Sequence, residues 1–236
     1  MPCIAPALLR GAFLALAATT AGLATSGASG QDTISEAETL LFQTDHLKNV
    51  APPATLSYAF RKTGSAEPSF DDSVELRVRV LDGVKQASVT FLSAERKTAC
   101  PEVTRAEGNP VLLCFLERDI REMERLTGGK SGYFRRAIRL ALARSAKLAR
   151  TRLSFGGREL AANEITVIPY ADDPLKDRIG KYASKTYVFT LSVEVPGGVH
   201  SVRTFVPSPE GTSNETPLLE ERLTLVGRRA PAAVIR

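Results

Sequence analysis

The strongest constraint on the fold is the alternation of apolar and polar residues on both sides of Asp82-Gly83. Apolar residues occupy every second position from Val74 to Val80, and the alternation resumes after the dipeptide as far as Phe91. A period of two is typical of a strand with one buried face, and Asp-Gly is a favoured two-residue hairpin turn. We therefore predict an antiparallel hairpin in one register. Its apolar pairs are Val78–Ala87, Leu76–Val89 and Val74–Phe91.

Further segments show the same alternation, or a weaker form of it, in both halves of the chain. They cover Leu56 to Phe60, Leu153 to Leu160 around Gly156-Gly157, Ile165 to Ile168, Tyr187 to Val206 around Gly197-Gly198, and Leu219 to Val226. If Gly197-Gly198 forms a two-residue turn, Val195 faces His200 and Phe189 faces Val206. The pattern predicts about seven to eight antiparallel strands in all.

An amphipathic helix pair is predicted between the two groups of strands. Asn109-Pro110 supplies an N-cap and a proline at the first helical position, and Gly128-Gly129 ends the first helix. The second helix is expected to run from Ser131 to about Arg150. Because an antiparallel sheet with one apolar face needs a cover, the fold class is α+β, with a curved antiparallel sheet covered by the inserted helices.

The first thirty residues have the three-part order of a secretory signal peptide. Arg10 precedes the apolar stretch from Gly11 to Ala24, which is too short to span a bilayer, and Ala28-Ser29-Gly30 makes a cleavage site. We expect residues 1–30 to be removed and residues 31–236 to form a single α+β domain. No other long apolar run occurs, so a periplasmic or secreted protein without a transmembrane segment is expected.

Two cysteines, Cys100 and Cys114, would remain after the leader is cleaved with Cys3. An even number of cysteines in an oxidising compartment favours a disulfide between them. The alternative is two unconnected thiols, one of which lies on a helix.

Charge is concentrated in one segment. The whole chain carries a net charge of +5, yet ten basic residues and no acidic residue lie between Arg125 and Arg158. On a helical wheel five of them share one face: Arg135, Arg136, Arg139, Lys147 and Arg150. Such a face could bind anionic lipid head groups or another acidic partner. The alternative is a solvated face, partly neutralised by acidic residues elsewhere. Nucleic acid fits poorly, because the protein is exported and the segment lacks interleaved aromatic residues.

Asp119 falls inside the apolar arc of the first helix. A buried carboxylate needs a partner, so we favour an ion pair with an arginine over a ligand-facing acid–base group. A hydrolase would have to use Asp119, His46 or His200, and nothing in the sequence places a nucleophile or a second carboxylate beside them. No metal-binding spacing occurs. We therefore expect no catalysis, no metal and no cofactor.

Three segments resemble uncharacterised exported bacterial proteins of the proteobacterial type, whose function is unknown. They are LFQTDHLKN from Leu41, GNPVLLCFLERDIREMERLTGG from Gly108, and VPGGV from Val195. The resemblance implies export and no mechanism. The order of elements is also similar, at the level of fold alone, to periplasmic lipoprotein carriers of the LolA and LolB type.

Together these features predict an exported binding or carrier protein. Its ligand would be a lipid or another hydrophobic molecule with an anionic group. The alternative is an envelope interaction or scaffold protein that docks an acidic protein through its basic helix or a sheet edge. The oligomeric state has no signal in the sequence.

Overall fold

The structure, a computed structural model, describes residues 34–208 and 216–229. The predicted signal peptide lies outside the described residues. Within these ranges there are nine strands: β1 (Ala54–Thr63), β2 (Phe70–Leu81), β3 (Val84–Phe91), β4 (Val103–Thr104), β5 (Lys147–Phe155), β6 (Arg158–Val167), β7 (Thr186–Leu191), β8 (Val199–Val206) and β9 (Leu219–Arg229).

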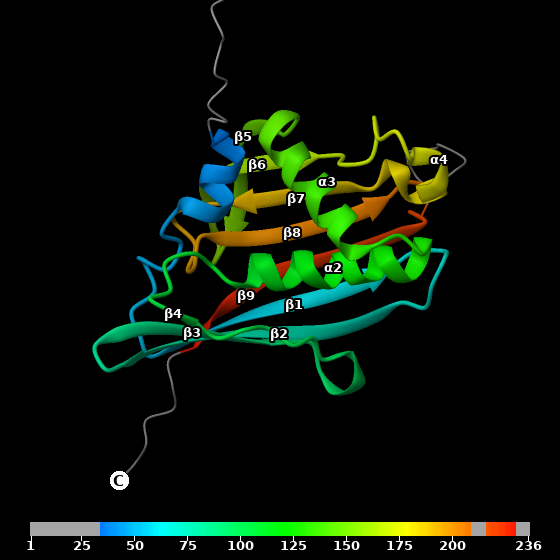
Figure 1. Cartoon of the computed structure of the whole chain (residues 1–236). Helices are drawn as coiled ribbons and strands as arrows, with labels where there is room; N and C mark the ends of the chain where they lie inside the picture. Colours follow the sequence, from blue (N-terminus) through cyan, green and yellow to red (C-terminus); the bar gives the residue numbers. More distant parts are fainter. Residues whose placement is uncertain (1–33, 209–215, 230–236) are drawn as a thin grey trace, which may run out of the picture. The chain divides into compact units, whose positions relative to one another are not determined.

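All nine strands belong to one antiparallel sheet in the order β4-β3-β2-β1-β9-β8-β7-β6-β5. The first four strands run outward from the centre, and the last five return from the other edge until β9 pairs with β1. β4 and β5 therefore end the sheet on opposite sides. The chain between them has to cross the sheet, and in Figure 1 the two long helices do so over one face.

Those helices are α2 (Val111–Thr127) and α3 (Ser131–Arg144). The Asn109 side chain accepts a hydrogen bond from the Val111 N–H at 3.1 Å, and Gly128 ends α2 in the left-handed conformation. The shorter helices are α1 (Glu36–Glu38), the π-helix η1 (Thr39–Gln43), the 3₁₀ helix η2 (Ala94–Arg96), α4 (Lys176–Ile179) and the 3₁₀ helix η3 (Gly180–Ser184). The predicted α+β class, with a helix pair inserted between two strand groups, is confirmed.

Aromatic side chains fill the layer between the helices and the sheet. Phe60 of β1, Phe91 of β3 and Phe115 of α2 are each at most 1% exposed, and their ring centroids lie 6.1–6.5 Å apart. The inner face of the sheet is thus covered by helices and packed with side chains of the described residues. The predicted hairpin at Asp82-Gly83 contributes to this layer with its predicted register confirmed pair by pair.

The predicted register of the second hairpin was wrong. Phe189 pairs with Val202 rather than Val206, and β7 ends at Leu191. Residues 192–198 form a loop instead of continuing the strand into a two-residue turn. Val195 is therefore part of this loop and has no strand partner.

Asn49 holds this loop from outside the hairpin. Its amide nitrogen donates to the Val193 and Val195 carbonyls at 3.1 and 2.7 Å, and its side-chain oxygen accepts from the Gly197 N–H at 3.0 Å. A side chain far away in the sequence therefore helps to stabilise the loop at which β7 ends.

The predicted end of the second helix was also wrong. α3 stops at Arg144, and residues 147–155 form β5, which pairs with β6 along its whole length from Lys147–Thr166 to Phe155–Arg158. The ladder extends the hairpin that the sequence predicted around Gly156-Gly157. The scattered apolar residues of this segment are compatible with a helix and with a strand. Its nine consecutive pairs with β6 decide in favour of the strand. The two-residue β4, which was not predicted, brings the strand count of the described residues to nine.

A disulfide links Cys100 to Cys114, as predicted, with a Cα–Cα distance of 5.8 Å. It ties the segment before β4 to the first turn of α2. None of the helices in the described part of the chain is long and apolar enough to cross a membrane.

Candidate functional site

The five predicted binding residues lie on two different elements. Arg135, Arg136 and Arg139 are exposed on α3, and we call them the α3 basic face. Lys147 and Arg150 are exposed on β5. The predicted single helical surface is therefore divided, because α3 ends before Lys147.

Only one residue of the α3 basic face is neutralised within the described part of the chain. The Arg135 guanidinium donates two hydrogen bonds to the Glu117 carboxylate of α2, at 2.8 and 2.7 Å. Arg136 and Arg139 form no ion pair with any residue that the structure describes. The alternative of internal neutralisation thus holds for Arg135 and does not extend to its two neighbours.

Asp119 of α2 is completely buried, as predicted, and its partner is a lysine instead of an arginine. The Lys185 ammonium group forms the ion pair, and the Tyr187 hydroxyl donates to the other carboxylate oxygen at 2.6 Å. The Tyr170 and Tyr187 hydroxyl oxygens lie 3.1 Å apart. Burial, and then the charge of Asp119, raise the pKa of both tyrosines. The cluster therefore pairs one carboxylate with one ammonium group beside two neutral tyrosines, out of contact with solvent. It links α2 to β7.

A second charge cluster under α2 was not predicted. The Lys62 ammonium group contacts Glu122 at 2.6 Å and lies 3.7 Å from Glu221, and the Arg118 guanidinium contacts Glu221 at 2.6 Å. Although burial opposes its ionisation, hydrogen bonds from Arg125 and Lys62 hold the pKa of Glu122 well below its ordinary value.

A signal for this cluster does exist in the strand patterns. Lys62 continues the inward positions of Tyr58 and Phe60, and Glu221 lies between the inward Leu219 and Leu223. A charged residue at an inward position of a strand, opposite a helix residue of opposite charge, predicts a buried ion pair.

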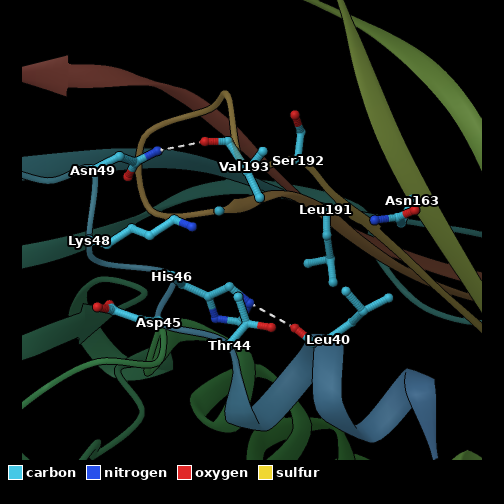
Figure 2. Close-up of a pocket in the computed structure, with 11 residues that line it drawn as sticks. Leu40, Thr44, Asp45, His46, Lys48, Asn49, Asn163, Leu191, Ser192 and Val193 are labelled. Carbon is cyan, nitrogen blue, oxygen red and sulfur yellow. Dashed lines mark hydrogen bonds between the residues drawn. The ribbon is translucent and has the colours of Figure 1, made fainter.

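The two histidines are structural in this fold. The Nε2 atom of His46 lies 2.8 Å from the Leu40 carbonyl oxygen, and Figure 2 shows this hydrogen bond. The Nδ1 atom accepts a hydrogen bond from the Asn109 N–H at 3.2 Å. Burial lowers the pKa of His46, against the opposing effects of the Leu40 carbonyl and Asp45. His200 packs edge-on against Phe155, with a centroid distance of 6.3 Å. Within the described residues, no group of three potential metal-ligating side chains is close enough to hold an ion.

The pocket beside His46 is too small for an organic ligand. It has a volume of about 30 Å³ and is lined by Leu40, His46, Leu191 and Val193, among others (Figure 2). Two of its polar residues, Asn49 and His46, are engaged in the hydrogen bonds that hold the loop and the start of α2. Both ring nitrogens of His46 are therefore engaged in hydrogen bonds to the backbone.

A larger pocket lies where the turn between α2 and α3 meets α4, and we call it the turn pocket. It has a volume of about 360 Å³, within the range of about 300–1,000 Å³ that is typical of small-molecule sites. Its walls are mainly apolar and aromatic, and it carries two cationic side chains. The lining residues are Thr127, Gly128, Gly129, Lys130, Tyr133, Phe134, Leu175, Arg178 and Ile179.

The two cations of the turn pocket are available to a ligand. Lys130 and Arg178 are exposed, and neither forms an ion pair within residues 34–208 and 216–229. Burial, with the nearby Asp173, raises the pKa of Tyr133 to about 12. This tyrosine is therefore neutral, and the pocket can surround an apolar group while it presents positive charge to an anionic one. Lys130 belongs to the basic segment that the sequence revealed, whereas Arg178 was missed because only the tertiary structure brings α4 to α3.

No family model matches the chain, and no curated protein matches it. Among solved structures, it is similar to the lipoprotein LppX of Mycobacterium tuberculosis, with 12% identity, coverage of 76% of this chain and 88% of that chain, and a TM-score of 0.32. It is also similar to a LolA superfamily protein from Nitrosomonas europaea, with 10% identity, coverage of 83% and 94%, and a TM-score of 0.22. The second match names the same family as the fold-level likeness predicted from the order of elements.

Proposed function

We propose that this is an exported binding or carrier protein for a hydrophobic molecule with an anionic group, and that it catalyses no reaction. The turn pocket is the observation that carries the proposal. Phe134, Leu175 and Ile179 would surround the apolar part of the ligand, and Lys130 and Arg178 would hold its anionic group.

Calorimetric titration with dodecanoate and dodecanol tests this assignment, because the two probes differ mainly in charge. We expect Lys130→Gln with Arg178→Gln to weaken dodecanoate binding by about tenfold, since both charge-assisted contacts are lost, and to change dodecanol binding less than about twofold. Leu175→Glu should weaken the binding of both probes, because it places a charge in the apolar wall.

A matched control is Arg136→Gln with Arg139→Gln, which removes the same charge from the exposed face of α3. It should leave the binding of both probes unchanged. Equal dodecanoate affinity in the Lys130/Arg178 variant would contradict the role of the cations. The absence of binding by either probe to the unmodified protein would contradict the pocket itself.

The α3 basic face would bring the carrier to anionic head groups. Arg136 and Arg139 are exposed and without an ion pair in the described part of the chain, so they can contact a surface directly. Sedimentation with phosphatidylglycerol vesicles should weaken at high salt and after charge reversal at Arg135, Arg136 and Arg139. Unchanged vesicle binding after both treatments would contradict this part of the proposal.

The second candidate function is the docking of an acidic envelope protein on the same α3 basic face. The same two unpaired arginines favour it. It would be supported if the charge-reversed variant lost a defined acidic protein partner while the unmodified protein bound neither vesicles nor dodecanoate.

A further inference from the structure

Within the described residues, β5 is a long sheet edge with free hydrogen-bonding groups. It is the terminal strand of the sheet there and pairs with β6 alone, in a continuous register without a bulge. Among the described residues, no other backbone group bonds to residues 147–155. An edge strand presents a row of unpaired N–H and C=O groups that another strand can use. The opposite edge offers far less, since β4 has two residues and covers part of β3.

The β5 edge is also strongly cationic. Its nine residues include Lys147, Arg150 and Arg152 and no acidic residue. All three side chains are exposed, and none forms an ion pair with a described residue. Because side chains alternate along a strand, Arg150 and Arg152 lie on one face and Lys147 on the other. An added strand would therefore meet positive charge on both of its faces.

We propose that the β5 edge binds an extended acidic segment of another polypeptide by strand addition. Backbone hydrogen bonds would supply the attachment, and carboxylates opposite Arg150 and Arg152 would supply the selectivity. A second copy of β5 fits poorly, because antiparallel pairing of two such edges sets cations against cations. A bilayer fits poorly as well, since the exposed side chains of β5 are Lys147, Ala149, Arg150, Arg152 and Ser154, and none of them is a large apolar group.

The test uses a fluorescein-labelled peptide in which Glu and Thr alternate, with anisotropy measured on the purified protein. We expect saturable binding, and a loss of about tenfold in affinity for Arg150→Glu with Arg152→Glu, because two attractive cross-strand pairs become repulsive. Lys97→Glu with Arg105→Glu makes the same change of charge at two exposed cations near β4, at the opposite end of the strand order. This matched control should alter the affinity by less than about twofold, because neither residue is at the β5 edge.

Two peptide controls separate strand addition from general attraction between charges. A peptide with Lys in place of Glu should not bind. Two further versions of the Glu peptide carry N-methyl groups at alternate residues, so that each version lacks the N–H groups of one edge. One of the two should no longer bind, because the backbone hydrogen bonds to β5 are blocked. Arg150→Gln with Arg152→Gln is a milder substitution that keeps the test valid if the Glu variant misfolds.

The proposal would be overturned by no binding of the Glu peptide, by an equal effect of the Lys97/Arg105 control, or by full binding of both methylated peptides. Binding of phosphatidylglycerol vesicles that depends on Arg150 and Arg152, without peptide binding, would identify a lipid and likewise overturn it. These outcomes are independent of the turn pocket, whose residues are unchanged in every variant of this experiment.

Discussion

At the scale of single residues, the main feature is ionic groups buried between α2 and the sheet. Asp119 and Lys185 are completely buried, and Glu221 is buried beside Lys62 and Arg118. Removing charges from water is costly, and a buried pair regains this cost only while both partners are present. These residues therefore determine how α2 is seated more than they add to the net stability of the fold.

Removing one partner of the Asp119–Lys185 pair should destabilise the protein strongly. We expect Lys185→Met to lower the free energy of unfolding by about 3–5 kcal/mol, because it leaves a buried carboxylate without its counter-charge. Urea denaturation measures the change. The double variant Asp119→Leu with Lys185→Met should cost less than Lys185→Met alone.

The matched control is Arg135→Met, since Arg135 and Glu117 form a pair that is 54% and 42% exposed. It should change the free energy of unfolding by about 1 kcal/mol or less. A loss for Lys185→Met as small as that of the control would contradict the inference that burial makes the Asp119–Lys185 pair costly to break.

His46 should make stability depend on pH. Its pKa is lowered by burial from the ordinary value of 6.5, so the unfolded chain binds more protons just below that pH. The stabilisation is therefore complete above the unfolded pKa and is lost as the pH falls toward the folded pKa. His46→Gln should flatten the pH dependence of the unfolding free energy at pH values below about 7. His200→Gln is a second variant for comparison. Burial also lowers the pKa of the half-buried His200, so this histidine contributes to the pH dependence in the same direction. An unchanged slope in His46→Gln would disprove the prediction.

At the scale of elements, the two long helices are held at several points along their length. The disulfide fixes the first turn of α2, the Asp119 cluster its middle, and the Lys62 cluster its second half. α3 is joined to α2 through Arg135, and Phe134 packs edge-on against Tyr170 at a centroid distance of 5.7 Å. The turn pocket lies at the junction of these helices with α4, so its shape depends on the seating of both.

The disulfide should stabilise the fold by restricting the unfolded chain. Cys100 and Cys114 are separated by 14 residues, and closing a loop of about 15 residues contributes roughly 3 kcal/mol in the chain-entropy model. Cys100→Ser with Cys114→Ser should lower the free energy of unfolding by about this amount. Reductant should destabilise the unmodified protein similarly and leave the double variant unaffected. If reductant also destabilised the double variant, the destabilisation by reductant would have a cause other than this disulfide.

At the scale of the whole described unit, the sheet has a protected centre and two unequal edges. β1 and β9 lie in the middle of the order and pair on both sides, whereas β4 and β5 each have one neighbour. The basic segment of the sequence is distributed between the helix layer and the β5 edge. The α3 basic face and the β5 edge are therefore separate surfaces, and variants can address them one at a time.

Hydrogen exchange should follow this arrangement. We expect the amides of β1 and β9 to exchange most slowly, because both edges of these central strands are paired, and the amides of β4 and of the free edge of β5 to exchange much faster. Exchange followed by mass spectrometry of peptides measures the order. Equal protection of β5 and β1 would show that another segment covers the β5 edge.

The sequence by itself determined the features that depend on short-range chemistry. The alternation around Asp82-Gly83 specified a hairpin and its register, Asn109 and Gly128 specified the ends of α2, and the apolar arc specified that Asp119 is buried. Periodicity and turn geometry act within a few residues, so one segment contains all the information they need.

Only the tertiary structure decided the features that depend on contacts between distant segments. Lys185, the partner of Asp119, lies 66 residues away, and Asn49 holds the loop after β7 from 146 residues away. The segment from Lys147 has a pattern compatible with helix or strand, and the nine pairs with β6 decide between them. The division of the basic residues into two surfaces, and the meeting of Lys130 with Arg178, follow from these contacts, because free energy gained by long-range packing outweighs weak local preference.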